Sequence, residues 1–132
     1  MAQSVNKFFN AILCEDVRDE AGNKKSLMGV LGGDVVVTSF PAPIWVAVFL
    51  QYQPDKDDAD ELSIVVRFVG DKTEMMKAKT SPTLKKDGVV TVVIPKGIAN
   101  FDKETTFRIF ASVNDGPEQE ILTKNVIKAA IT

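Results

Sequence analysis

Short strand-like segments recur along the whole chain, and this recurrence constrains the fold more than any other feature. The segments are either continuously apolar or alternate apolar with polar residues, which is typical of β-strands. Turn-forming residues such as Gly22-Asn23 and Asn114-Asp115-Gly116 stand between them. We expect strands at residues 7–14, 26–31, 35–38, 44–52, 62–69, 89–94, 105–113 and 120–127.

The most economical fold for eight or nine short strands is an all-β, two-sheet antiparallel β-sandwich of the immunoglobulin-like kind. A closed barrel is the alternative. Residues 1–132 have the length of a single domain. Segment 72–79 is ambiguous, because Asp71 and Glu74 have the spacing of a helix capping box. We favour a strand there and expect at most one short helix.

Prolines mark the places where strands are expected to end or to lie at an edge. Pro41 and Pro43 lie too close together for a central strand, so that segment is expected to cross between the sheets or to form an edge. Pro95 is expected to end the strand before it, and residues 96–101 would then form a loop.

The composition excludes several classes of function. The chain has no histidine, which removes the commonest general base and metal ligand, and its single cysteine allows no internal disulfide. The net charge of −2 favours neither nucleic acid nor an acidic membrane. No apolar run is long enough for a membrane span, and no signal peptide is recognisable. We therefore expect a protein without cofactors, in the cytoplasm or in a virion assembled there.

An acidic segment is the most conspicuous candidate for a metal site. It places five carboxylates within seven residues, and calcium takes six to eight oxygen ligands. Calcium binding and a solvated loop both remain open, and the solvated loop is preferred because charge runs in loops usually serve solubility. The five residues are Asp55, Asp57, Asp58, Asp60 and Glu61.

Other residues with reactive or charged groups have structural interpretations. Cys14 has acidic neighbours, which do not activate a thiol, so we expect a buried and inert side chain. Asp16 and Arg18 are expected to form an ion pair. The lysines between Lys72 and Lys86 lack interleaved aromatic residues, so they indicate a solvated strand edge and not a site for single-stranded nucleic acid. We find no catalytic constellation and expect no enzyme.

The N-terminal third resembles a known family. The segments that carry the resemblance are Leu13-Cys14-Glu15-Asp16-Val17-Arg18, Lys25-Ser26-Leu27-Met28-Gly29-Val30 and Phe40-Pro41. Together they resemble a bacterial family of domains of unknown function over residues 11 to 41. The resemblance implies a β-sandwich and a bacterial or phage setting, and it implies no activity.

Several expected strands are apolar on both faces, although one face of each sheet in a sandwich normally meets water. Either residues 96–101 cross over the second face, or another chain covers it. We expect a homo-oligomer or a docked protein partner, at an interface formed by Trp45, Ala47, Phe49, Val65 and Val69. The sequence thus predicts a structural or protein-interaction module of a bacterial or phage assembly. A loop-based module that binds sugar or calcium is the alternative.

Overall fold

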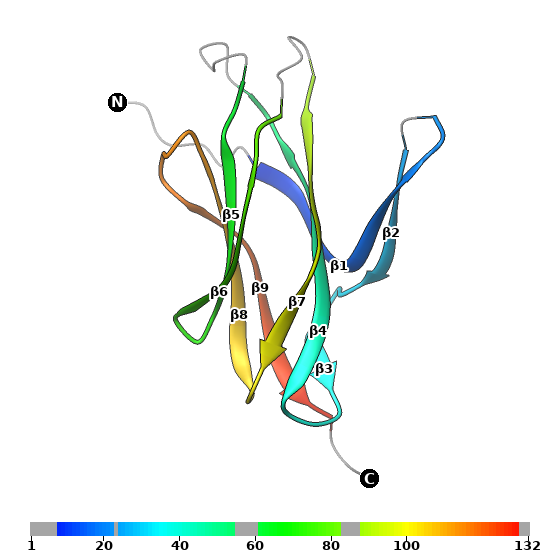
Figure 1. Cartoon of the computed structure of the whole chain (residues 1–132), viewed down its shortest axis with the longest axis vertical. Helices are drawn as coiled ribbons and strands as arrows, with labels where there is room; N and C mark the ends of the chain where they lie inside the picture. The colour runs from blue at the N-terminus through cyan, green and yellow to red at the C-terminus, as the bar shows by residue number, and fades with distance from the viewer. Residues whose placement is uncertain (1–7, 23, 55–60, 83–87, 130–132) are drawn as a thin grey trace.

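The computed structural model describes residues 8–22, 24–54, 61–82 and 88–129. These residues form nine strands and no helix (Figure 1). The strands are β1 (Phe8–Glu20), β2 (Lys24–Val30), β3 (Val35–Val37), β4 (Ala42–Tyr52), β5 (Ile64–Gly70), β6 (Thr73–Thr80), β7 (Val90–Phe101), β8 (Thr105–Val113) and β9 (Gln119–Lys128).

The strands form two sheets that pack face to face. Sheet A has the order β2-β1-β4-β7, and sheet B has the order β3-β9-β8-β5-β6. All pairs are antiparallel except β3 with β9. No strand pair among the described residues joins the two sheets, so they do not close on each other and the predicted β-sandwich is confirmed.

The connectivity is that of an immunoglobulin-like domain. Strands β4 and β7 take the places of immunoglobulin strands B and E, and β5, β8 and β9 take those of C, F and G. Strand β6 extends sheet B beyond β5. Strands β1 and β2 form a hairpin on the other side of β4, and its far half leaves the body of the sandwich (Figure 1).

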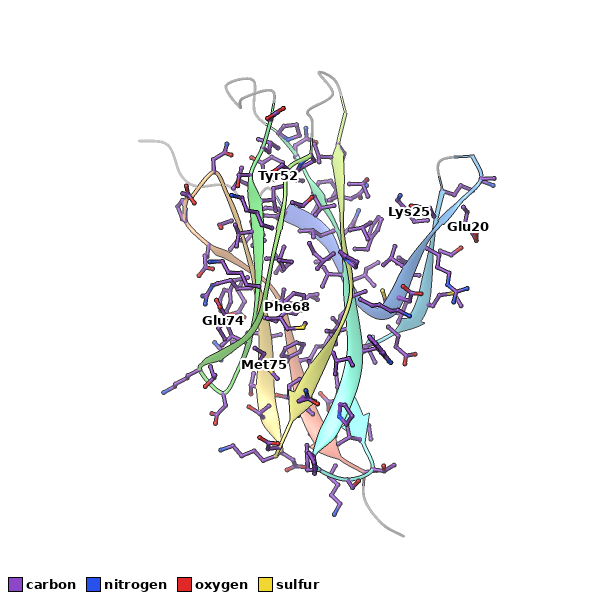
Figure 2. All side chains as sticks on the ribbon, in the orientation of Figure 1. Glu20, Lys25, Tyr52, Phe68, Glu74 and Met75 are labelled. Atoms are coloured by element: carbon purple, nitrogen blue, oxygen red, sulfur yellow. The ribbon has the colours of Figure 1, made fainter. Side chains whose placement is uncertain are left out.

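Apolar side chains that alternate along the strands fill the space between the sheets. Phe68 lies there (Figure 2), and its ring centre is 6.1 Å from that of Phe107, which meets Phe101 edge-on at 5.1 Å. Phe8 and Tyr52 form a second aromatic pair at 5.0 Å. The core is therefore built from the inward-facing half of every long strand.

Local sequence signals located several elements correctly. The ambiguous segment is a strand, β6, and Asp71 and Lys72 both have positive φ in the turn before it. Strand β8 has the bounds predicted for it, and Asn114 and Asp115 again have positive φ in the turn that follows. The segment with Pro41 does cross between the sheets, from β3 in sheet B to β4 in sheet A.

Two predictions about strand ends were wrong. Strand β7 does not stop at Pro95 but continues to Phe101, so residues 96–101 are paired with β4 and do not cross over a sheet. Pro95 is accommodated because β7 is an edge strand and its register with β4 shifts at a bulge between Val46 and Val48. The first strand, expected to end at Cys14, also continues further, because β1 runs to Glu20 and pairs with β2.

No helix in the described part of the chain has the length and apolar character needed to cross a membrane.

Candidate functional site

The middle of the outer face of sheet A is apolar. Val46, Val48 and Leu50 of β4 point into the core, so Trp45 and Phe49 point outward. Outward-facing neighbours lie directly opposite them: Ile98 opposite Trp45, and both Ile12 and Val93 opposite Phe49. Trp45 is 47% exposed and Ile98 is 46% exposed. These apolar side chains come from three neighbouring strands, β1, β4 and β7, and together they form the apolar surface of sheet A.

This apolar surface has a charged neighbour and an adjoining hollow. The Lys96 ammonium lies 5.0 Å from the centre of the Trp45 ring, which is the geometry of a cation–π contact. A hollow of about 450 Å³ lies beside Trp45 and is also lined by Glu15 and Leu31. The surface is therefore not flat at its Trp45 end.

Cys14 lies in the middle of the same face and is completely buried, as the sequence predicted. It lies opposite Ala47 on one side and Val30 on the other. Its thiol contacts the carbonyl oxygens of Asp16 at 3.4 Å and Ala47 at 3.7 Å. Burial raises the pKa of the Cys14 thiol, and the nearby carboxylates raise it further. The thiol is thus kept protonated, which makes it a poor nucleophile.

The outer face of sheet B is covered by charged side chains. Arg67 of β5 donates to both carboxylate oxygens of Glu118, from Nε at 2.5 Å and Nη2 at 2.7 Å, and to Glu74 at 3.4 Å. The same guanidinium lies 5.5 Å from the centre of the Phe110 ring. Its hydrogen bonds hold the pKa of Glu118 below the ordinary range and raise the pKa of Arg67. Arg108 and Glu120 add a further ion pair on this face.

The five residues of the predicted interface therefore lie on two opposite faces. Trp45, Ala47 and Phe49 are on sheet A, and Ala47 is fully buried, so it offers no contact surface. Val65 and Val69 are half-buried on sheet B, on either side of Arg67. They cannot belong to one continuous surface with Trp45.

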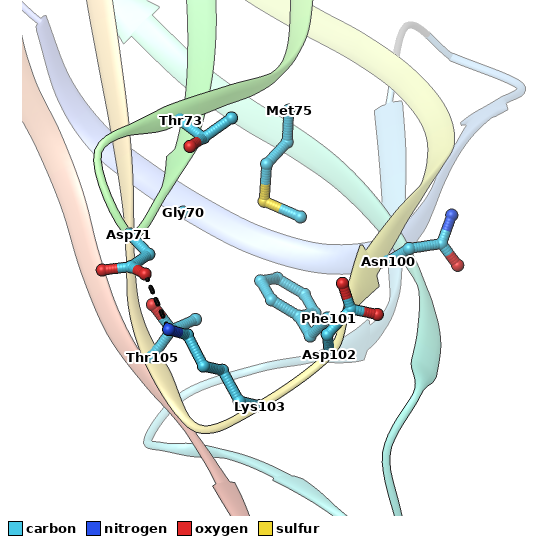
Figure 3. Close-up of a pocket in the computed structure, with 9 residues that line it drawn as sticks. All are labelled: Gly70, Asp71, Thr73, Met75, Asn100, Phe101, Asp102, Lys103 and Thr105. Atoms are coloured by element: carbon cyan, nitrogen blue, oxygen red, sulfur yellow. Dashed lines mark ion pairs between the residues drawn. The ribbon is translucent and has the colours of Figure 1, made fainter.

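A small pocket opens at one end of the sandwich, where the β5–β6 and β7–β8 turns meet (Figure 3). Its volume is about 250 Å³, and Met75 and Phe101 form its apolar part. Asp71 and Lys103 at the rim form an ion pair of 3.1 Å. A Cβ atom added at Gly70 would lie 2.6 Å from the Met75 sulfur. The pocket is thus the end of the core, closed in part by an ion pair between two turns.

The acidic segment is mostly outside the described residues. The structure does not describe four of its five acidic residues, Asp55, Asp57, Asp58 and Asp60. The fifth, Glu61, is described and its side chain is exposed. Within the described ranges, no three acidic or cysteine side chains are grouped closely enough to hold a metal ion. The calcium hypothesis therefore stays a prediction. Asp16 and Arg18 do form the predicted ion pair, at 3.2 Å, but on strand β1 and not in a loop.

Sequence reasoning missed several residues of the apolar surface. Ile98 was assigned to a loop because of Pro95, and Val30 and Met28 were not singled out although both are exposed on β2. The signal that could have found Ile98 was the alternation that resumes after Gly97, with Ala99 and Phe101 pointing into the core.

The comparisons with known proteins add no relative. The chain matches no protein-family model, and a search of curated proteins gives no match.

Proposed function

We propose that this chain is a non-catalytic structural or protein-interaction module that contacts its neighbours in an assembly through the outer face of sheet A. The observation that carries the proposal is the pair of exposed side chains Trp45 and Ile98, which lie opposite each other on the outer face of sheet A with the half-buried Phe49 on the same face. Exposed apolar patches of this kind usually mark contact sites between proteins.

Several features support a contact surface over a catalytic site. The chain contains no histidine, and its one thiol is buried and protonated. Tryptophan is enriched at the centres of protein interfaces, and Trp45 is 47% exposed on this face. The bacterial or phage setting of the proposal rests on the resemblance of residues 11 to 41 to a bacterial family.

Self-association of matched variants tests the proposal. Light scattering at micromolar concentration should show an oligomer for the wild type and a smaller mass for Phe49→Lys, because the variant places a charge in the middle of the apolar surface. Val65→Lys, which adds the same charge to the outer face of sheet B, should keep the wild-type mass.

Two results would contradict the proposal. One is a wild type that stays monomeric over the whole concentration range. The other is an equal loss of mass in Phe49→Lys and Val65→Lys, which would show that the added charge acts through solubility or folding and not through one face.

A further inference from the structure

Two consecutive methionines, Met75 and Met76, lie where β6, an edge strand of sheet B, faces β7, an edge strand of sheet A. The register of β6 with β5 shifts at this point. Phe68 lies opposite Met76 and Val69 lies opposite Glu74, so Met75 is the extra residue of a β-bulge. Because of the bulge, both methionines pack against the core, although successive strand residues normally point to opposite faces. Figure 2 shows Met75 between the sheets and Glu74 on the outer side.

Each of the two sulfur atoms lies against a glycine. The Met75 sulfur is 2.6 Å from the position that a Cβ atom would take at Gly70, and the Met76 sulfur is 3.2 Å from the same position at Gly97. Gly70 ends β5 of sheet B, whereas Gly97 belongs to β7 of sheet A. Met76 therefore packs across from one sheet to the other, and Met75 fills the end of the core.

The described methionines differ in their access to solvent. Met75 lines the pocket of about 250 Å³ at the end of the sandwich, together with Phe101 (Figure 3). Met76 is not among the residues that line this pocket. A water molecule takes about 30 Å³ in the liquid, so the pocket admits a small polar oxidant to Met75. Met28 on β2 is 44% exposed and lies outside the core. Peroxide can therefore reach both Met28 and Met75, but only Met75 supports the core.

We propose that Met75 is a site of reversible oxidation by hydrogen peroxide, and that its sulfoxide loosens this end of the sandwich. In the reaction the thioether sulfur attacks one oxygen of the peroxide and the O–O bond breaks. The transferred oxygen gives its proton to the departing hydroxide, which leaves as water. The sulfur is oxidised by two electrons to the sulfoxide, and the peroxide is reduced. The reaction needs no catalytic side chain.

The sulfoxide does not fit the position of the thioether. The Met75 sulfur is too close to Gly70 for an added oxygen to lie between them. The oxygen is a strong hydrogen-bond acceptor, and placing it against the Phe101 ring without a donor costs free energy. The oxidised side chain therefore turns toward water and withdraws from the core. Phe101 then loses a neighbour on the side away from Phe107, which it meets edge-on at 5.1 Å. The contact between the β5–β6 and β7–β8 turns weakens as a result.

Peroxide treatment of the folded protein tests the proposal. Peptide mass spectrometry follows each methionine, and thermal unfolding of the same samples follows stability. Met28 should gain oxygen first, without a change in melting temperature. Oxidation of Met75 should follow, and the melting temperature should fall by several degrees in step with it. Treatment with the two methionine sulfoxide reductases, which act on opposite sulfoxide epimers, should restore the original melting temperature.

Two leucine variants assign the effect to one sulfur. Leucine for methionine conserves volume and apolar character, so Met75→Leu should fold and should keep its melting temperature in peroxide. Met28→Leu is the matched control and should show the full fall. A fall that persists in Met75→Leu would overturn the proposal, and so would a Met75 that stays unoxidised after Met28 has reacted completely. If Met75→Leu is unstable, the parallel between oxidation and stability in the wild type, and its reversal by the reductases, still decide.

This site is separate from the contact surface proposed above. Met75 and Met76 face the core from sheet B, whereas Trp45 and Phe49 lie on the outer face of sheet A. Loss of self-association in Phe49→Lys and loss of stability on oxidation of Met75 are therefore independent results, and either proposal can fail without the other.

Discussion

The outward residues of the two central strands, β4 and β5, are similarly apolar in sequence, but the outer faces of the two sheets differ in polarity. On β4 the outward residues are Trp45, Ala47 and Phe49, and on β5 they are Val65, Arg67 and Val69. A single arginine makes the difference. It binds Glu118 and Glu74 and lies over Phe110, so sheet B is covered by its own charged side chains. On sheet A, Lys96 lies over Trp45 in a similar way, but Trp45 is still 47% exposed.

The comparison shows that an apolar strand pattern alone does not define an interface. Val65 and Val69 look as apolar as Phe49 in the sequence, but the neighbouring ion pairs give their face a polar surface. What distinguishes a contact surface is the absence of such a cover together with exposed aromatic area. The first of the following predictions removes Arg67, which covers sheet B, and the second weakens its ion pair with Glu118.

Removing Arg67 should make sheet B resemble sheet A. In Arg67→Ala the Phe110 ring loses the guanidinium above it and Glu118 loses both hydrogen bonds. We expect a several-fold rise in the fluorescence of a dye that binds apolar surfaces, and a loss of roughly 1 kcal/mol in the free energy of unfolding, because the ion pair is partly exposed. The matched control is Arg108→Ala, which removes a charge from the same face. If it raises the dye signal equally, the comparison fails.

Weakening the Arg67–Glu118 pair should have a smaller, pH-dependent effect. The pKa of Glu118 is lowered in the folded state, so the pair stabilises the protein at neutral pH. This stabilisation is lost as pH falls from the ordinary carboxyl pKa, about 4.3, through the lowered folded value. Glu118→Gln should therefore lower the free energy of unfolding at pH 7 by less than about 1 kcal/mol. Urea unfolding of both proteins from pH 7 to pH 3 should show the difference shrinking, and a constant difference would contradict this account.

The fold was predictable where the decisive signals are local. Strand β8 follows from its own alternation, and the turn at Asn114-Asp115 follows from residues that accept positive φ. The continuation of β7 was not predictable in this way. Pro95 normally ends a strand, and it is tolerated here because β7 is an edge strand and bulges at Pro95 and Lys96, opposite Ala47 of β4, which lies some fifty positions away in the sequence.

The candidate site was predictable only in part, because only some of its signals are local in the sequence. Trp45 and Phe49 could be proposed as surface residues because both faces of their strand are apolar. The separation of Val65 from them could not be foreseen, because it depends on Arg67 meeting Glu118, which lies 51 residues away. The far half of the β1–β2 hairpin was also missed, because residues 18–20 have the polar composition of a loop and are strand only through pairing with β2.

The central claim is that neighbouring chains contact the outer face of sheet A, and Trp45 reports on that face directly because it is the single tryptophan of the chain. Quenching of its fluorescence by acrylamide should be efficient in dilute solution, where half of the side chain is exposed. The quenching constant should fall as the protein concentration rises into the micromolar range, and it should stay high in Phe49→Lys. A quenching constant that does not change with concentration, together with a monomeric mass throughout, would contradict the claim.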